Sequence, residues 1–162
     1  MKPENVNRKE IMEKITPLIE NTLIRFDFIP VEIEFVKENH RWFLRVFIYS
    51  YTKGVTLDDC ENITRSLNDF LDEIIPCKYY LEISSPGLER KFKSDKEFLI
   101  FKGKNIILKL NSGVGDDEEK VFKAKILDFD ENEGLNVQKL DDESNIWIKR
   151  EKIHSAKLYI ED

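Results

Sequence analysis

Residue types that build enzymatic and metal sites are scarce in this chain of 162 residues. The two cysteines, Cys60 and Cys77, are too few for a disulfide framework and lack the Cys-x-x-Cys spacing of zinc and redox sites. We expect both to be reduced, mostly buried thiols. The two histidines, His40 and His154, are too few for a metal site or a triad unless the fold joins them with a thiol. We predict no metal, no cofactor and no catalytic residues.

Glycine-rich motifs are missing as well. The six glycines fall in predicted turns, and none belongs to a phosphate-binding loop, a dinucleotide fingerprint or a nucleophile elbow. Neighbouring carboxylates such as Asp141 and Asp142 lie in a turn, where solvent keeps their chemistry ordinary. An enzyme is therefore the least favoured hypothesis, and it would require an activity that depends on His40 or His154.

Long apolar runs are absent too. No stretch of about 18 apolar residues is present, and no basic-then-apolar leader opens the chain. We expect a cytoplasmic protein that has no contact with a membrane and acts as a monomer.

Positive charge is in deficit, because 26 basic residues face 32 acidic ones and leave a net charge of −6. Residues 1–91 hold 13 basic and 16 acidic side chains, and residues 92–162 hold the same numbers, so each half carries −3. A protein that binds nucleic acid over a large surface needs clustered lysine and arginine. The balance favours basic partners, or nucleic acid held by a local patch only.

The first half alternates between helical and strand periods. We predict a helix over about 8–23 capped by Asn7, strands over 26–36 and 41–49 joined by a turn at 37–40, a helix from the Thr56 cap to Ile74, and a strand over 79–84. These elements predict a two-layer α-β-β-α-β domain over residues 1–85, with helices on one face of the sheet. The 41–49 strand is apolar on both faces, so we expect its second face to be shielded as well.

Asp58, Asp59 and Glu61 open the second predicted helix. Carboxylates are favoured in a first helical turn, so capping explains them. A surface for a basic partner is the alternative function of the same residues.

The stretch Tyr79–Arg90 joins two kinds of sequence. Its alternating strand ends in a Ser-Ser-Pro-Gly-Leu segment, where Pro86 suits the second position of a type II turn and Gly87 the third. We predict a stiff interdomain joint made by Ser84, Ser85, Pro86, Gly87, Leu88 and Arg90, with residues 86–93 as turn and linker. Arg90 either ties the two domains together through a carboxylate or is simply solvated.

Residues 94–162 predict a short helix, capped by Ser94 and Glu97, and then five strands of five to nine residues. The strands are expected over 105–110, 121–129, 135–140, 145–149 and 156–160, with a 3₁₀-like turn at 151–154. Short strands with turn-rich gaps are typical of a small β-barrel, and this turn would fit an SH3-like one. The overall fold class is α+β.

Two surface features of this half have two explanations each. Trp147, Lys149 and Arg150 could grip single-stranded RNA, as could Lys120, Lys123 and Lys125 with Phe122, but alternating lysines also suit a solvated face. The acidic runs at 116–119 and 128–133 either keep hairpins soluble or recognise a partner.

Residues 81–90, Leu-Glu-Ile-Ser-Ser-Pro-Gly-Leu-Glu-Arg, resemble the signature of the bacterial ribosome maturation factor RimP family. The segments 31–35, 44–49 and 54–60 occur in the order that this family has, and Ala-Lys-Leu at 156–158 also resembles it. The chain departs from the family pattern at Lys91, where proline is usual, and at Tyr49-Ser50, where an aspartate is common.

The resemblance implies an N-terminal α/β domain followed by a C-terminal SH3-like or Sm-like barrel. It also implies a non-enzymatic assembly factor that binds the immature small ribosomal subunit and aids its late maturation. A basic small-subunit ribosomal protein, with possible local rRNA contact, is the implied partner. A stand-alone single-stranded RNA-binding module that uses the barrel is the alternative function.

Overall fold

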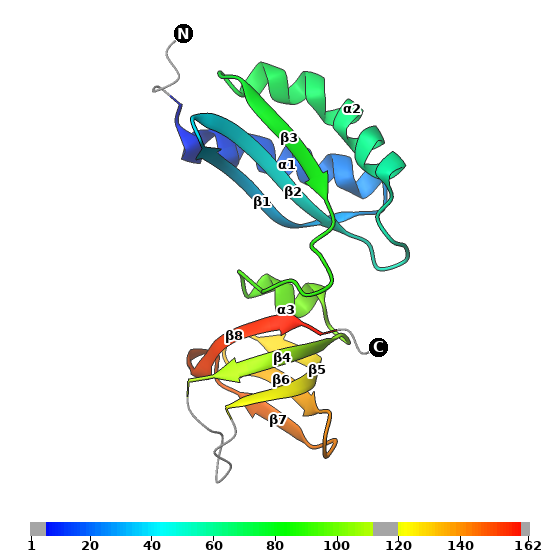
Figure 1. Cartoon of the computed structure of the whole chain (residues 1–162), viewed down its shortest axis with the longest axis vertical. Helices are drawn as coiled ribbons and strands as arrows, with labels where there is room; N and C mark the ends of the chain where they lie inside the picture. Colours follow the sequence, from blue (N-terminus) through cyan, green and yellow to red (C-terminus); the bar gives the residue numbers. More distant parts are fainter. Residues whose placement is uncertain (1–5, 112–119, 160–162) are drawn as a thin grey trace. The chain divides into compact units, whose positions relative to one another are not determined.

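The computed structural model describes residues 6–111 and 120–159, which form a mixed α+β fold with two sheets (Figure 1). The chain divides into two compact units, residues 1–86 and 87–162. Over the described residues, no helix has both the length and the apolar character that crossing a membrane requires.

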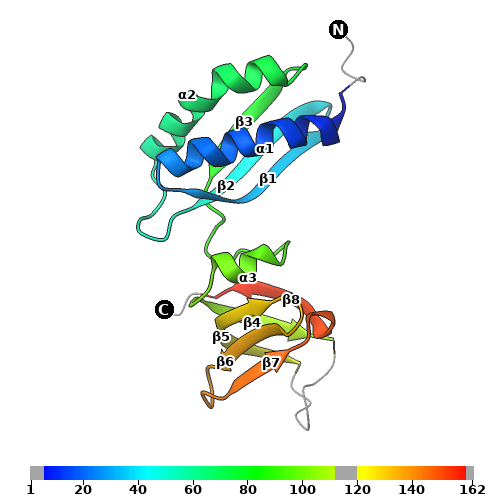
Figure 2. The ribbon, with the colours of Figure 1, turned by 180° about the vertical axis from the view of Figure 1, so that it is seen from behind.

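Unit 1 contains two helices and a three-stranded sheet. The elements are α1 (Arg8–Arg25), β1 (Ile29–Glu38), β2 (Arg41–Tyr49), α2 (Leu57–Ile74) and β3 (Tyr79–Ser84), in the predicted order. Strand β2 lies in the centre, antiparallel to β1 and parallel to β3. Both helices cover the same face of this sheet, which Figure 2 shows from the helical side.

The core of unit 1 lies between the helices and this face of the sheet. Helix α1 contributes Ile11, Ile15 and Ile19 at helical spacing, and α2 contributes Ile63, Leu67 and Leu71. Leu44, Val46 and Ile48 of β2 meet them from the sheet. The side chains of Ile15, Ile19 and all three β2 residues are fully buried, so the helical and strand periods define one continuous core.

Helix α1 extends two residues beyond its prediction. It contains Pro17, and Arg25 is its last residue. The chain then turns at Phe26–Phe28, where Asp27 takes a positive φ of 65° and the Phe28 N–H donates to the Leu23 carbonyl. This turn uses the residues predicted to start the first strand, so β1 begins at Ile29.

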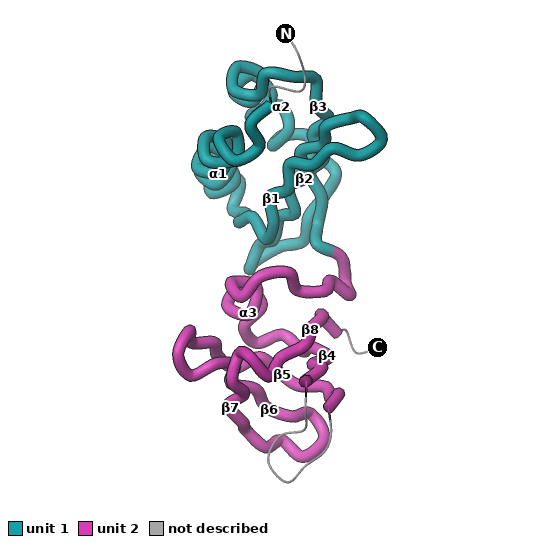
Figure 3. Tube along the Cα trace, turned by 90° about the vertical axis from the view of Figure 1, so that its left-hand side faces the viewer, with its two compact units in different colours: residues 1–86 teal, residues 87–162 magenta. Residues whose placement is uncertain are grey.

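Unit 2, drawn in magenta in Figure 3, is a short helix followed by a five-stranded antiparallel sheet. Its elements are α3 (Lys96–Ile100), β4 (Asn105–Leu110), β5 (Val121–Asp130), β6 (Gly134–Lys139), β7 (Asn145–Ile148), the 3₁₀ helix Arg150–Lys152 and β8 (Ile153–Leu158). The strand order is β7-β6-β5-β4-β8. The pairing among described residues is that of an open sheet, so the closed SH3-like or Sm-like barrel stays a prediction.

The last strand was predicted too late. It starts at Ile153, directly after the 3₁₀ helix, and ends at Leu158, while the predicted end at Ile160 lies outside the described residues. Pairing decides this boundary, since Leu110 of β4 faces Ile153 and Ile106 faces Leu158.

Candidate functional site

The predicted joint differs from the type II turn expected at Ser85–Leu88. Strand β3 ends at Ser84 as predicted, and Gly87 has the positive φ, 86°, that the prediction required. The chain nevertheless turns at Leu88 and Glu89, just after the Ser-Ser-Pro-Gly segment, which runs without a turn of its own. The exposed Leu88 side chain lies in this turn.

Arg90 forms a buried ion pair with Glu97 on α3. The Arg90 Nε donates to a Glu97 carboxylate oxygen at 2.6 Å, and both side chains are almost fully buried. The two residues belong to unit 2, so this pair fixes the segment after the turn onto α3. The role of Arg90 in tying the two units together stays a prediction.

Glu97 also forms one half of the capping box predicted for α3, although the helix itself begins at Lys96. Its second carboxylate oxygen accepts from the Lys93 and Ser94 backbone N–H groups at 2.9 and 2.8 Å and from the Ser94 hydroxyl at 3.1 Å. Burial alone would raise the pKa of Glu97, but the hydrogen bonds from Arg90 and the Lys93 backbone outweigh it and lower the pKa. Glu97 is therefore a structural carboxylate, ionised at neutral pH.

Of the three acidic residues at the start of α2, one caps the helix and two do not. The Thr56 side chain accepts from the Asp59 backbone N–H, and the Asp59 carboxylate accepts from the Thr56 N–H, which completes a capping box. Hydrogen bonds from Thr56 lower the pKa of Asp59. Glu61 pairs with Arg65 one turn later, and Asp58 is exposed. Capping thus explains Asp59 alone.

Helix α2 remains acidic beyond its first turn. Asp69, Asp72 and Glu73 are exposed near its C-terminal end, and its last turn carries no basic residue. Asp72 and Glu73 lie in the last turn, where carboxylates oppose the helix dipole, so helix stability does not account for these two charges. Asp72 accepts a hydrogen bond from the Tyr79 hydroxyl at 2.7 Å, whereas Asp69 and Glu73 have no such local role among the described residues. The result is an acidic helix surface, defined by Asp58, Glu61, Asp69, Asp72 and Glu73.

The predicted RNA-contacting residues of unit 2 are only partly available. Trp147 is 49% exposed on the edge strand β7, and Lys149 is exposed just after it. Arg150 instead donates to Asp95 at 2.7 Å and to the Ile153 carbonyl at 3.4 Å, within unit 2. Its guanidinium mainly holds the 3₁₀ helix beside the start of α3.

The predicted basic and aromatic run on β5 is separated by the pleat. Phe122 points into the core of unit 2, while Lys120 and Lys125 are exposed and Lys123 lies over the Tyr159 ring at 4.3 Å. Phe122 therefore does not share a surface with these lysines. Of the acidic runs, 116–119 lies outside the described residues, and Asp130 uses its carboxylate to cap its own turn.

The helix-free face of the unit 1 sheet carries aromatic and charged side chains. Phe43 of β2 contacts Tyr80 of β3 with ring centroids 5.5 Å apart. Arg45 lies 4.8 Å over the Phe43 ring and donates to Glu38 and to Glu82. The predicted shielding of this second face thus comes from neighbouring aromatic rings and an ion-paired arginine.

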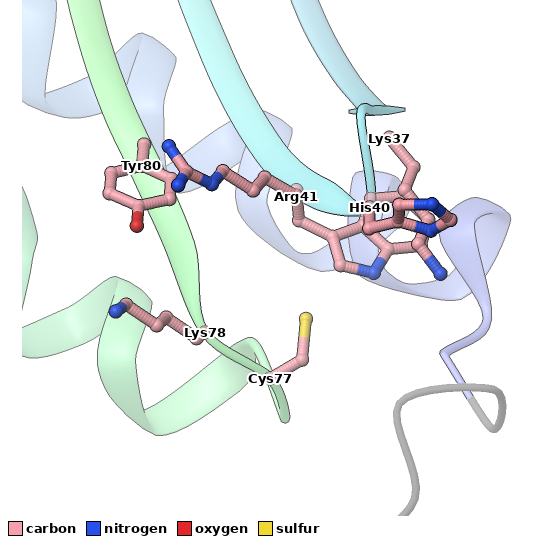
Figure 4. A pocket seen from close by; sticks show the side chains of 7 residues that line it. Lys37, His40, Arg41, Cys77, Lys78 and Tyr80 are labelled. Carbon is pink, nitrogen blue, oxygen red and sulfur yellow. The ribbon is translucent and has the colours of Figure 1, made fainter.

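A pocket of about 380 Å³ lies at the end of this sheet, between the β1–β2 turn and the start of β3 (Figure 4). Its lining contains four basic side chains, Lys37, His40, Arg41 and Lys78, and no carboxylate. Trp42, Tyr80 and Cys77 complete the walls. Burial raises the pKa of the Cys77 thiol, and Lys37 partly offsets this. We name this feature the hairpin-end pocket.

Sequence reasoning did not find this pocket. Its cations lie in two segments, 37–41 and 78, that are far apart in the sequence and meet through the parallel pairing of β2 and β3. His40 belongs to the pocket, while His154 lies on β8 in the other unit. No group of three His, Cys, Asp or Glu residues in the described part of the chain is placed to hold a metal ion.

A family model described as the RimP N-terminal domain matches residues 18–89. The match spans most of unit 1 and extends through the Ser-Ser-Pro-Gly-Leu segment. It confirms the family resemblance seen in the sequence, and it includes both the acidic surface of α2 and the hairpin-end pocket.

Proposed function

Since the chain belongs to the RimP family of ribosome maturation factors through its N-terminal domain, we propose that it is a non-enzymatic assembly factor for late maturation of the small ribosomal subunit. We propose further that it binds a basic small-subunit ribosomal protein, with limited contact to pre-rRNA. It acts in the cytoplasm, where small subunits mature. It acts as a monomer, because neither the contact with the ribosomal protein nor the contact with pre-rRNA requires a second copy of the chain.

The acidic surface of α2 is the main evidence for a basic protein partner. Five exposed carboxylates on this helix are opposed by one arginine, Arg65, which pairs with Glu61. Glu73 lies in the last turn of α2, where the helix dipole disfavours a carboxylate, and neither Asp69 nor Glu73 takes part in the N-terminal cap, so a basic partner gives both charges a role. Complementary charge steers such a partner and sets its orientation.

Limited RNA contact follows from the charge balance. The net charge of −6 repels the phosphate backbone over most of the surface, so only local basic groups can approach it. A factor of this kind avoids indiscriminate RNA binding and still tolerates the rRNA that surrounds its protein partner.

We also propose the finer architecture that the family implies. The domains are residues 1–85 and 94–162, with 86–93 as the linker, and the second domain is an SH3-like barrel. The five-stranded order and the 3₁₀ helix between β7 and β8 support this assignment. A solution structure that leaves β7 and β8 far apart, as two free edges, would contradict it.

Co-sedimentation tests the proposed function. On a sucrose gradient of cell extract the protein should migrate with free small subunits and their precursors, and an even spread across all fractions would contradict the proposal. The double variant Asp69→Asn/Glu73→Gln should weaken this association. The matched control Glu13→Gln/Glu20→Gln removes two exposed carboxylates from α1 and should leave it unchanged.

A stand-alone RNA-binding module is the second candidate, favoured by the half-exposed Trp147 beside the exposed Lys149. Such a module binds naked RNA with an affinity that falls steeply with salt, by about 0.7 log units per decade of salt for each phosphate contact. Substituting Trp147 with alanine should then abolish RNA binding, whereas the assembly factor should keep its association with small subunits.

A further inference from the structure

We propose that the hairpin-end pocket is an anion site that holds one phosphate-bearing nucleotide of unpaired RNA. The inference deepens the proposed function and rests on it only for the source of the RNA. The chemistry of the pocket itself comes from the residues that line it.

The cations of the pocket have no carboxylate partner within the described residues. Lys37, Arg41 and Lys78 all lie in the lining, and none of them forms an ion pair there, although the chain has an excess of acidic residues. The nearby Glu38 is taken up by Arg45 on the helix-free face of the sheet. Three unpaired positive charges around one concavity favour a polyvalent anion such as phosphate.

Tyr80 positions two of these cations. The Arg41 guanidinium lies 5.8 Å and the Lys78 ammonium 5.5 Å from the centre of the Tyr80 ring. Arg41 extends from β2 toward Tyr80 on β3, and Lys78 lies on the same side of the pocket (Figure 4). The Tyr80 ring thus holds the Arg41 guanidinium and the Lys78 ammonium near each other before a ligand binds, which lowers the entropic cost of binding.

The β1–β2 turn adds a strained residue to the pocket. Asn39 and His40 form the two-residue loop of the hairpin, with φ values of 52° and 66°. Loops with two positive φ values strongly favour glycine at the second position, so histidine there costs backbone strain. A functional role of the imidazole in the pocket would offset this strain, because its N–H group can donate a further hydrogen bond to an anion.

Shape and apolar walls distinguish a nucleotide from a bare phosphate or an acidic peptide. A volume of about 380 Å³ is within the range of small-ligand pockets. Trp42 and Tyr80 provide aromatic wall surface next to the cations, and RNA-binding proteins commonly pair such surfaces with bases and phosphates. An unpaired strand is required, because a base held in a duplex cannot enter the pocket.

Protection of Cys77 from alkylation tests the proposal directly. The thiol lines the pocket, while Cys60 lies in the first turn of α2, about 21 Å along the helix from its C-terminal end, and serves as an internal control. The full chain is alkylated with N-ethylmaleimide at mildly alkaline pH, because the thiol pKa is raised, and both cysteine peptides are quantified by mass spectrometry. The probes are hexauridylate RNA, inorganic phosphate and polyglutamate.

We expect hexauridylate to slow the alkylation of Cys77 and not that of Cys60. Arg41→Gln and Lys78→Gln should each weaken hexauridylate binding about tenfold, as loss of one charge-assisted contact predicts. Arg25→Gln, which removes an exposed charge at the far end of α1, should have no effect. The affinity should fall with salt with a shallow log–log slope of about −0.7, as contact with a single phosphate of a single strand requires.

His40→Gly separates binding from folding. It removes the backbone strain, so the melting temperature should stay the same or rise while hexauridylate binding weakens. A loss of binding in this variant therefore reports the missing imidazole and not an unfolded hairpin.

Several results would overturn the inference. Equal protection by inorganic phosphate at the same concentration means a small-anion site, and stronger protection by polyglutamate means an acidic protein partner. Unprotected Cys77, or RNA binding that survives Arg41→Gln and Lys78→Gln, also excludes the pocket. If these variants bind small subunits normally, the proposed function stands without the inference. If the wild type ignores small subunits but binds hexauridylate here, the inference stands alone.

Discussion

Replacing Glu97 with alanine removes the acceptor of four hydrogen bonds from a fully buried position in unit 2. The substitution takes away an ion-pair partner of the buried Arg90 and leaves the backbone donors of Lys93 and Ser94 without this acceptor. Removing one member of a buried ion pair typically costs about 3–5 kcal/mol. A domain of this size is stabilised by about 5–15 kcal/mol in total. We therefore expect the melting temperature of unit 2 to fall by at least about 12 °C.

The two tryptophans allow each unit to be followed separately. Trp42 belongs to unit 1 and Trp147 to unit 2, and the chain has no others. Urea denaturation of Glu97→Ala in a Trp42→Phe background should show an early transition of Trp147. The same substitution in a Trp147→Phe background should leave the Trp42 transition in place. A shift of both transitions would instead support the predicted role of Arg90 in coupling the units.

Acid titration and a double variant test whether the buried ion pair of Glu97 stabilises unit 2. Because the folded pKa of Glu97 is lowered from its ordinary 4.5, the carboxylate stabilises the fold above that pH, and this stabilisation is lost as the pH falls through the lowered value. The stability gap between wild type and Glu97→Gln should thus close on acidification below pH 4.5. Arg90→Met/Glu97→Met should be less destabilised than Glu97→Ala. A Glu97→Ala protein with wild-type stability would refute the reasoning.

Three further substitutions probe local geometry. Gly134→Ala should destabilise unit 2 by more than about 2 kcal/mol, because the added Cβ would lie 2.1 Å from the Ile148 carbonyl oxygen at a φ of 99°, and the Trp147 transition should show it. Gly87→Ala should cost about 1–2 kcal/mol through its positive φ alone, since no atom lies within 4 Å of the new Cβ; an unchanged melting temperature would contradict the described backbone. Thr56→Ala should lower the stability of unit 1 by about 1 kcal/mol through loss of the capping box, with Thr56→Ser as the conservative control.

Local patterns were sufficient to predict most elements. Helix α2 runs between a capping threonine and a proline, and β2 spans the predicted residues 41–49, because each signal depends on neighbours in the sequence. Gly87 has the positive φ expected of it. Boundaries moved where tertiary pairing or a helix-end turn decided them, as at Ile29 and Ile153.

Long-range arrangement limited the prediction of sites. The partner of Arg90 was not identified, although Glu97 lies only seven positions away, because Glu97 was assigned to a cap. The joint turns later than its proline and glycine suggested. The basic residues of the hairpin-end pocket come from two separate segments, and no periodicity in one segment indicates that Arg41 and Lys78 meet at Tyr80.

Because β2 pairs in parallel with β3, which is synthesised later, the hairpin-end pocket is completed in two steps during translation. The β1–β2 hairpin closes through a two-residue loop, and hairpins form in about 1–10 μs. Strand β3 begins thirty positions after β2 ends, so at about 5–20 residues per second it is synthesised about 2–6 s later. A growing chain thus displays Lys37 and Arg41 alone, and Lys78 and Tyr80 join them only when α2 has crossed over the sheet. A ligand that contacts all four of these side chains binds the completed unit 1 more tightly than a nascent chain. By mass action, such a ligand also stabilises the pairing of β3 with the sheet.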